Sequence, residues 1–372
     1  MESLSSIGSW TIGTILAFLV VLTVVVFIHE LGHFLVARWC GVKVRTFSIG
    51  FGKEIFGFTD RHGTRWQLAS IPLGGYVKFI DDMNPASVPD TDSPAARTEG
   101  AFQSKSVAQR AAVVAAGPIA NFILAIVIFT GVFMAYGKVV LIPRVDEIQA
   151  GSAAEAAGFQ KGDLVLEIDG RSIESFSDIS RIVSVNANVP LIVVVERNGE
   201  RLTFEATPRS EVIESGPAAG NARGLLGLKH SGKDAEVIRL GPLQAFAEAG
   251  KQTWYIIDQT FTFIGHLFRG YQSIEQLSGP VGIAKVAGEA ASLGILPFIN
   301  LAAFLSVSIG LFNLFPIPLL DGGHLLFYAI EAIRGRSLSA RKQELGFAVG
   351  AAVLFALMAV AMWNDISRLI TG

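Results

Sequence analysis

The sequence predicts a polytopic α-helical membrane protein with four transmembrane helices, a β segment and one soluble α+β domain outside the cytoplasm. Composition is the first indication: 51% of the 372 residues are hydrophobic and only 17% are charged, whereas soluble domains carry about 25% charged residues. The others are four long apolar runs and, between the second and third of them, a stretch of β-type segments. The net charge of −2 argues against a nucleic-acid partner.

The first predicted span lies within residues 1–40, and its apolar run extends from about Ile12 to Ala37. This run exceeds the roughly 20 residues that a helix needs to cross a bilayer. Residues 1–10 contain no Lys or Arg, and no small-residue cleavage site follows them. We therefore expect a retained transmembrane helix rather than a cleaved signal peptide. Cys40 is the only cysteine, which excludes an internal disulfide.

A metal-binding motif, His29-Glu30-Leu31-Gly32-His33, lies inside this apolar run. Two histidines at i and i+4 share one helix face, so both imidazoles can reach one ion. Glu30 lies beside them and can take a proton from an attacking water. The alternative is a hydrogen-bonded histidine pair, but it leaves Glu30 unexplained, because an unpaired carboxylate in lipid costs several kcal/mol.

A catalytic zinc site needs a third protein ligand and leaves its fourth position to water. The preferred candidate is Asp321, in the run Asn313-Leu-Phe-Pro-Ile-Pro-Leu-Leu-Asp321-Gly-Gly, and His324 is the alternative. Pro316 and Pro318 should break the helix beside a polar cavity. Asn313 could either hydrogen-bond a neighbouring helix or hold the substrate.

The first half of the chain continues with strands, a loop and a second span. Residues 41–80 show alternation and paired glycines, which predict short strands and hairpins. Residues 81–110 begin with a Pro-, Asp- and Ser-rich stretch and are expected to form a loop. Residues 111–136 form the second span, in which Asn121 is expected to pack and hydrogen-bond.

Residues 139–230 change character and predict the soluble domain, with β-type runs and one helix near residues 177–184. Residues 231–296 have a mostly helical pattern that is too interrupted for a span, so we expect an extracytoplasmic or interfacial helical segment. Three histidines outside the motif are expected at the surface, namely His62, His230 and His266.

The remaining residues predict a third span at 297–323, a loop at 324–345 and a fourth span at 346–364. Basic residues cluster between residues 38 and 110 and again in the loop 324–345, so the positive-inside rule makes both regions cytoplasmic. The soluble domain and both termini then lie on the extracytoplasmic side. Spans one and three both run inward, which brings the histidine motif and Asp321 to a similar depth.

Taken together, the motifs resemble the bacterial site-2 protease family, the intramembrane zinc metalloproteases of the RseP type. They are HELGH, SIGFG, PLGGYVK, AAGPIANF, GPVGIAK and NLFPIPLLDGG, and they cover nearly the whole chain. Residues 139–230 resemble a PDZ domain through GSAAEAAGFQKGDLVLEIDGRSI, with residues 223–228 as a candidate closing strand. One such domain is recognisable here, where the best-known member of the type has two in tandem.

The resemblance implies one Zn²⁺ per chain, held by His29, His33 and Asp321, with Glu30 as the catalytic base. It also implies that residues 41–80 form a membrane-associated β segment that pairs with an unwound substrate. The expected substrate-binding or transition-state residues are Asn313, Gly50, Gly52, Gly74 and Gly75.

The resemblance further implies a multi-pass protein of the bacterial cytoplasmic (inner) membrane. Its expected substrates are single-span membrane proteins, such as anti-sigma factors or signal-peptide remnants, after a first extracytoplasmic cleavage. Peptide or protein C-termini are the expected ligands of the PDZ domain.

Two other functions compete with proteolysis. A PDZ membrane scaffold could carry a structural zinc site closed by His324 as a fourth ligand. A transporter could also contain broken helices and buried ions, but the two halves of the sequence show no inverted repeat.

Overall fold

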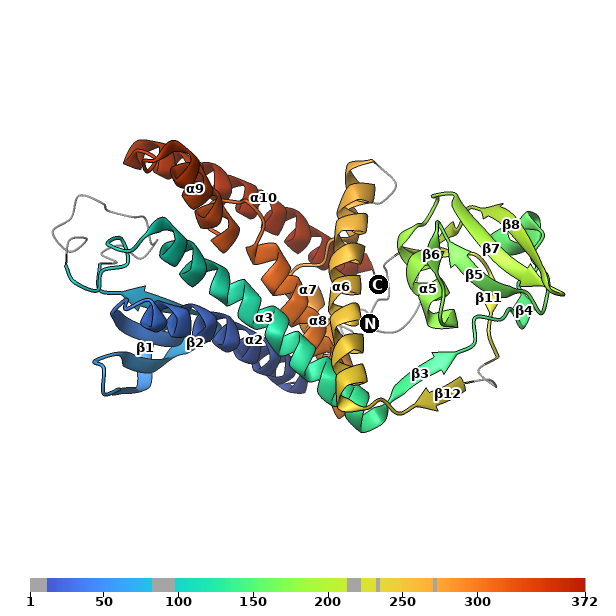
Figure 1. Ribbon diagram of the computed structural model, residues 1–372, viewed down its shortest axis with the longest axis horizontal. Helices are drawn as coiled ribbons and strands as arrows, with labels where there is room; N and C mark the ends of the chain where they lie inside the picture. The colour runs from blue at the N-terminus through green and yellow to red at the C-terminus, as the bar shows by residue number, and fades with distance from the viewer. Residues whose placement is uncertain (1–11, 82–97, 213–221, 232–234, 270–272, 372) are drawn as a thin grey trace. The chain divides into compact units, whose positions relative to one another are not determined.

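The computed structural model describes residues 12–81, 98–212, 222–231, 235–269 and 273–371 (Figure 1). These residues fall into two compact units. The first unit comprises Met1–Ile128 and Gly279–Trp363, and the second comprises Phe129–Ser278 and Asn364–Gly372. Most of the predicted loop 81–110 lies outside the described residues.

Four helices are long and apolar enough to cross a membrane, as predicted. They are α2 (Ile12–Trp39), α3 (Val107–Tyr136), α8 (Ile295–Asn313) and α10 (Ala340–Thr371). Many large apolar side chains on these helices are exposed, as expected for residues that face lipid rather than water. The chain is a multi-pass membrane protein with helices and strands.

The β segment after the first span consists of two long strands instead of several short hairpins. Strands β1 (Val44–Thr59) and β2 (Arg65–Phe79) pair with repeated shifts of register. As a result, residues 46–49 of β1 pair with residues 75–78 of β2 and also with residues 65–68. Phe47 anchors this sheet, because it is fully buried and stacks on Trp66. The sheet contacts α2, the helix with the histidine motif.

Span three is shorter than predicted. Helix α8 ends at Asn313 rather than extending to residue 323, and Asp321 is the first residue of a separate helix, α9 (Asp321–Arg334). The intervening residues contain Pro316 and Pro318, which lack the backbone N–H that a continuous helix needs. Helix α9 also occupies part of residues 324–345, where the sequence predicted only a loop.

Helix α7 (Pro280–Ser292) lies within residues 231–296, the segment predicted to be extracytoplasmic or interfacial, yet it packs along α2 in the first unit. Small residues allow this close approach, since a Cβ added to Gly288 would lie 2.5 Å from Oγ1 of Thr14. The remainder of the segment contributes helix α6 (Pro242–Phe268) and the short 3-10 helix η2 (Ile274–Gln276) to the second unit.

A compact α/β module forms most of the second unit. A four-stranded sheet has the order β6-β5-β7-β8, formed by Arg171–Ser172, Leu164–Ile168, Leu191–Arg197 and Glu200–Ala206. Helix α5 (Phe176–Val185) covers it where one helix was predicted, and Ser175 and Asp178 form a capping box at its start. Val165, Leu191 and Val193 are fully buried between the sheet and the helices.

Short strand pairs and one short helix complete the module. Antiparallel pairing joins β9 (Arg209–Val212) to β10 (Ala222–Leu225), β4 (Glu147–Ile148) to β11 (Leu228–Lys229), and β3 (Lys138–Leu141) to β12 (Ala235–Ile238). The short helix is α4 (Ala153–Ala157). The candidate closing strand at 223–228 is thus divided between β10 and β11.

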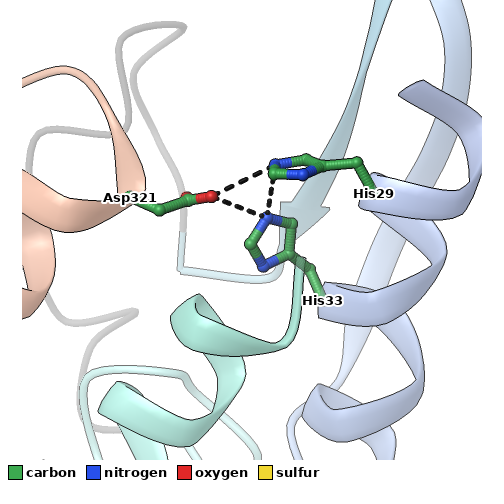
Figure 2. Close-up of side chains that lie close together, drawn as sticks. All are labelled: His29, His33 and Asp321. Atoms are coloured by element: carbon green, nitrogen blue, oxygen red, sulfur yellow. Dashed lines mark hydrogen bonds and ion pairs between the residues drawn. The ribbon is translucent and has the colours of Figure 1, made fainter. Parts of the chain in front are cut away.

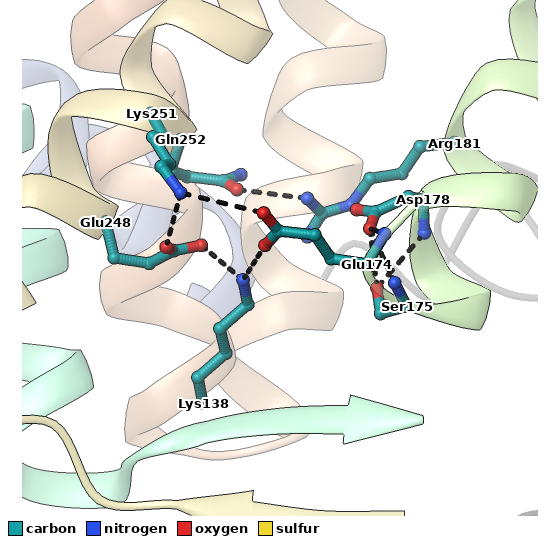
Figure 3. Close-up of polar contacts among 8 residues, drawn as sticks. All are labelled: Lys138, Glu174, Ser175, Asp178, Arg181, Glu248, Lys251 and Gln252. Atoms are coloured by element: carbon teal, nitrogen blue, oxygen red, sulfur yellow. Dashed lines mark hydrogen bonds and ion pairs between the residues drawn. The ribbon is translucent and has the colours of Figure 1, made fainter. Parts of the chain in front are cut away.

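Helix α6 is attached to this module by charged and polar contacts (Figure 3). Nζ of Lys138 lies 2.5 Å from Oε1 of Glu248 and 3.9 Å from Oε2 of Glu174. Further along the helix, Arg181 donates to the Gln252 side chain at 3.2 Å.

The side chains of two histidines expected at the surface are buried in this unit. His266 of α6 is 7% exposed, and its Nδ1 lies 3.0 Å from the carbonyl oxygen of Val185 at the end of α5. The His230 side chain is 3% exposed. The prediction failed for both because tertiary contacts cover them, whereas His62 is exposed as expected.

Candidate metal centre

Three side chains from two distant parts of the chain meet in the first unit (Figure 2). His29 and His33 extend from one face of α2, and Asp321 reaches them from the start of α9. Nε2 of His29 lies 3.1 Å from Oδ2 of Asp321, Nε2 of His33 lies 3.5 Å from the same oxygen, and the two nitrogens are 3.2 Å apart. The three ligand atoms therefore form a nearly equilateral triangle.

The outer nitrogens of the two imidazoles determine which way their lone pairs point. Nδ1 of His33 lies 2.9 Å from the carbonyl oxygen of Val113, which can only accept a proton. The proton of a neutral His33 is therefore on Nδ1, and Nε2 presents a lone pair to the triangle.

Nδ1 of His29 lies 3.4 Å from Nδ2 of the Asn121 amide. The Oδ1 atom of that buried amide has no hydrogen-bond partner within the described chain. With the amide turned so that Oδ1 faces the ring, Oδ1 accepts the Nδ1 proton, and Nε2 of His29 also presents a lone pair.

The residues fit a zinc ion. Bonds of roughly 2.0–2.1 Å at a tetrahedral angle separate two ligand atoms by about 3.3 Å, which matches the three edges of 3.1, 3.2 and 3.5 Å. Oδ2 of Asp321 is buried and lacks a hydrogen-bond donor within the described residues. Three converging acceptor atoms with no shared proton repel one another, and a cation removes that repulsion.

Glu30 lies beside this triangle and contacts strand β2. Its carboxylate accepts a hydrogen bond from the backbone of Val77, and a Cβ added to Gly75 would lie 3.1 Å from its Cγ. The side chain is partly buried. Glu30 is therefore held between the face of α2 that carries His29 and His33 and the edge of the β segment.

A cavity of about 390 Å³ connects these groups. Its polar lining includes His29, Glu30, His33, Asp321 and Asn313, and its apolar lining includes Phe79, Phe102, Val113, Val114 and Tyr328. A volume of this size accommodates water together with part of an extended peptide. Three candidate metal ligands, a carboxylate and room for a substrate are thus combined in one place.

The structure brings some of the predicted substrate-binding residues to this cavity. Gly75 and Asn313 line it, whereas Gly50, Gly52 and Gly74 do not. Those three glycines instead adopt positive φ angles of +87°, +91° and +131°, which glycine tolerates best. His324, the alternative third ligand, lines the cavity but is not part of the three-residue cluster.

Sequence reasoning missed Gly117 of α3. A Cβ at this position would lie 2.3 Å from Nε2 of His33 and 2.9 Å from Cε1 of His29. Any other residue would therefore enter the space of the two imidazoles. The motif AAGPIANF contains this glycine, but only the tertiary contact shows why a side chain is excluded there.

The chain immediately before Asp321 is tightly folded. Leu319 has a φ of +88°, which is unusual for a residue with a Cβ. A Cβ added to Gly322 would lie 2.3 Å from the carbonyl oxygens of both Leu314 and Phe315. The carboxylate is thus presented by a compact turn beneath α8.

Comparison with known proteins finds a family match over most of the chain. The model of a protein family described as Peptidase family M50 matches residues 17–357. A protein of Agrobacterium fabrum named "Putative zinc metalloprotease" is 46% identical over 379 residues, with 100% of each chain covered.

Two further relatives carry more specific names. Metalloprotease MmpA of Caulobacter vibrioides is 41% identical over 381 residues, with 95% of each chain covered. Regulator of sigma-E protease RseP of Salmonella typhimurium is 32% identical over 448 residues, covering 95% of this chain and 98% of the relative.

The fold and the matches define the class: the protein is a membrane zinc metallopeptidase. The chain belongs to peptidase family M50, the site-2 protease family that the motifs resemble.

Proposed function

We propose that this protein is an intramembrane protease that hydrolyses peptide bonds within the transmembrane segments of single-span proteins. The observation that carries the proposal is the triangle of His29, His33 and Asp321 beside Glu30 on a membrane-length helix. These three side chains hold one zinc ion per chain, and Glu30 is the catalytic base.

Each group of the site has its own role in peptide-bond hydrolysis. A zinc ion in the triangle supplies Lewis acidity, which polarises the scissile carbonyl and makes water a nucleophile near neutral pH. Glu30 takes a proton from the attacking water on a carboxylate oxygen and passes it to the amide nitrogen as the C–N bond breaks. The hydrogen bond from Val77 keeps the carboxylate oriented toward the cavity.

Strand β2 is the proposed docking edge for an unwound substrate. On one side, residues 75–78 of β2 pair with β1. Successive residues of a strand direct their N–H and C=O groups to opposite edges. Because the backbone of Val77 bonds Glu30, the groups of Gly75, two residues earlier, point to the same cavity-facing edge. A substrate strand can pair there, with its scissile carbonyl beside the metal and Asn313 contacting it.

The α/β module at residues 139–230 is the proposed PDZ domain. A small cavity of about 90 Å³ lies between α5 and residues 223–228, lined by Ile179, Val183, Leu225 and their neighbours. An apolar groove between a helix and a strand suits the C-terminus of a peptide or protein. In this scheme the module faces the extracytoplasmic side of the bacterial inner membrane, as do both termini. The proposed substrates of the protease are single-span proteins such as anti-sigma factors or signal-peptide remnants, after a first extracytoplasmic cleavage.

A cleavage assay with Glu30→Gln tests the function. The variant keeps the shape of the side chain but cannot act as a base, so we expect the cleavage rate to fall by about 10²–10⁴-fold. The assay uses purified protein in lipid vesicles with a tagged single-span substrate that lacks its outer domain, and zinc content is measured in parallel. Zinc-loaded wild type that leaves the substrate uncut would exclude the protease function and favour a scaffold or a transporter. A zinc-loaded variant that cleaves like wild type would exclude Glu30 as the base.

A further inference from the structure

We propose that Arg110 is a positioning residue for the metal site, which it serves by fixing the helix that carries Asp321. This inference depends on the proposed function for the identity of the ligands. Arg110 lies in the first turn of α3 and touches neither the ligands nor the proposed substrate edge. Its effect passes through α9.

Arg110 makes three contacts while its side chain is only 10% exposed. Nη2 donates to Oε1 of Glu331 on α9 at 2.7 Å, and Nε donates to the carbonyl oxygen of Lys105 at 3.2 Å. The guanidinium carbon lies 4.9 Å from the centre of the Tyr328 ring, also on α9. An arginine held at three points, two of them on one helix, fixes that helix against α3.

The three contacts suit a guanidinium and not an ammonium. The planar group donates in two directions and stacks on an aromatic face at the same time, whereas lysine offers a single compact charge. The pair is also shielded from water, because the Glu331 side chain is 17% exposed and Tyr328 is 7% exposed. Removing one partner would leave the other charge buried without compensation.

Helix α9 transmits this constraint to Asp321. The carboxylate is on the first residue of α9, and Glu331 is ten residues further along the same helix, a distance of about 15 Å. Tyr328, between them, lines the metal cavity. The residues before Asp321 form a turn after the end of α8, so α9 is the rigid element that orients the carboxylate.

The same face of α3 touches both other ligands. The carbonyl oxygen of Val113 accepts from His33, Gly117 makes room for both rings, and Asn121 contacts His29. With Arg110 these positions recur at intervals of three and four residues and so form one stripe along the helix. Helix α3 contributes no ligand itself. It contacts both histidines directly and, through Arg110, the helix that carries Asp321.

The test measures zinc retention and ligand geometry in purified full-length protein. Glu331→Gln keeps the side-chain shape but removes the charge. Arg110→Lys keeps the charge but removes the planar guanidinium that donates in two directions. For both variants we expect zinc to be lost to a chelator at about tenfold lower chelator concentration than for wild type. With Co²⁺ in place of zinc, we expect the visible absorption bands to change in intensity or position.

Arg38 provides a matched control. It is also a partly buried arginine, with Nη1 3.0 Å from Asp60 and its guanidinium carbon 5.3 Å from the centre of the Phe34 ring. Its pair joins α2 to the β segment and does not involve α9. Arg38→Lys should therefore retain zinc and the Co²⁺ spectrum of wild type. Wild-type zinc retention in both Arg110→Lys and Glu331→Gln, or an equal loss in Arg38→Lys, would overturn the inference.

The outcome is independent of the proposed chemistry. Should zinc-loaded wild type fail to cleave the substrate, the protease function fails, while the zinc and Co²⁺ measurements still decide the role of Arg110. Conversely, if the zinc measurements exclude a role for Arg110, the cleavage assay with Glu30→Gln is unaffected.

Discussion

At the residue scale, the site depends on which lone pairs face one another. His29 and His33 each use one ring nitrogen to contact α3 and direct the other toward Asp321. Three acceptor atoms this close together repel one another, and a cation among them removes that repulsion. The outer contacts are therefore as much a part of the site as the ligands.

The first prediction concerns which residue, Asp321 or His324, is the third zinc ligand. We expect Asp321→Ala to lower zinc affinity by at least about 100-fold, since it removes one of three ligand atoms. His324→Ala should retain zinc, because His324 lines the cavity without joining the cluster. Metal content after dialysis against a chelator measures both. Loss of zinc from His324→Ala with retention in Asp321→Ala would reverse the assignment.

At the element scale, α3 is the support against which the site is built. Its stripe from Arg110 to Asn121 contains the glycine on which both imidazoles rest. Ser306 of α8 also donates to the backbone oxygen of Asn121 at 2.8 Å. Helices α2, α3 and α8 are thus joined around a buried amide that itself contacts His29.

The stripe predicts the effect of a single methyl group. Gly117→Ala would place a carbon 2.3 Å from His33 Nε2, so we expect it to lower stability by about 1–3 kcal/mol and to displace zinc. Thermal unfolding and metal content measure the two effects.

Gly131→Ala on the same helix is the control. A Cβ added to Gly131 would meet no heavy atom within 4 Å, and alanine favours a helix by about 0.8–1 kcal/mol over glycine. The control should therefore unfold at or above the wild-type temperature. Equal behaviour of the two variants would show that the methyl group does not meet the imidazoles.

At the scale of the whole molecule, orientation in the bilayer determines which side supplies the substrate. The basic residues near the inner ends of spans one and three predict that the metal site is nearer the cytoplasm and that residues 139–230 are outside.

Cysteine labelling measures this orientation. In a Cys40→Ala background, we expect Glu200→Cys in the α/β module to react with an impermeant reagent applied from outside. Arg336→Cys, after α9, should react only once the membrane is opened. Both positions are exposed in the structure. Labelling of Arg336→Cys but not of Glu200→Cys in intact cells would show that the topology is the opposite of the one predicted.

The pattern of apolar runs determined much of this molecule in advance. A span must satisfy its own backbone hydrogen bonds and present apolar side chains to lipid, so four helices follow from composition and length alone. The spacing of His29, Glu30 and His33 likewise follows from helical periodicity. Asp321 is the preferred candidate both because Pro316 and Pro318 predict a helix break there and because of the resemblance to the site-2 protease family.

Only the tertiary structure decided the contacts that depend on distant residues. The packing of α7 on α2 comes from interhelical contacts, and the end of α8 at Asn313 and the start of α9 at Asp321 are seen only in the folded chain. The burial of His266 against α5 has the same kind of origin within the second unit. The roles of Gly117 and Asn121 arise because α3 crosses the ligand face of α2. Local sequence specifies which side chains a helix presents, but the neighbour that each one meets is fixed only when the helices pack together.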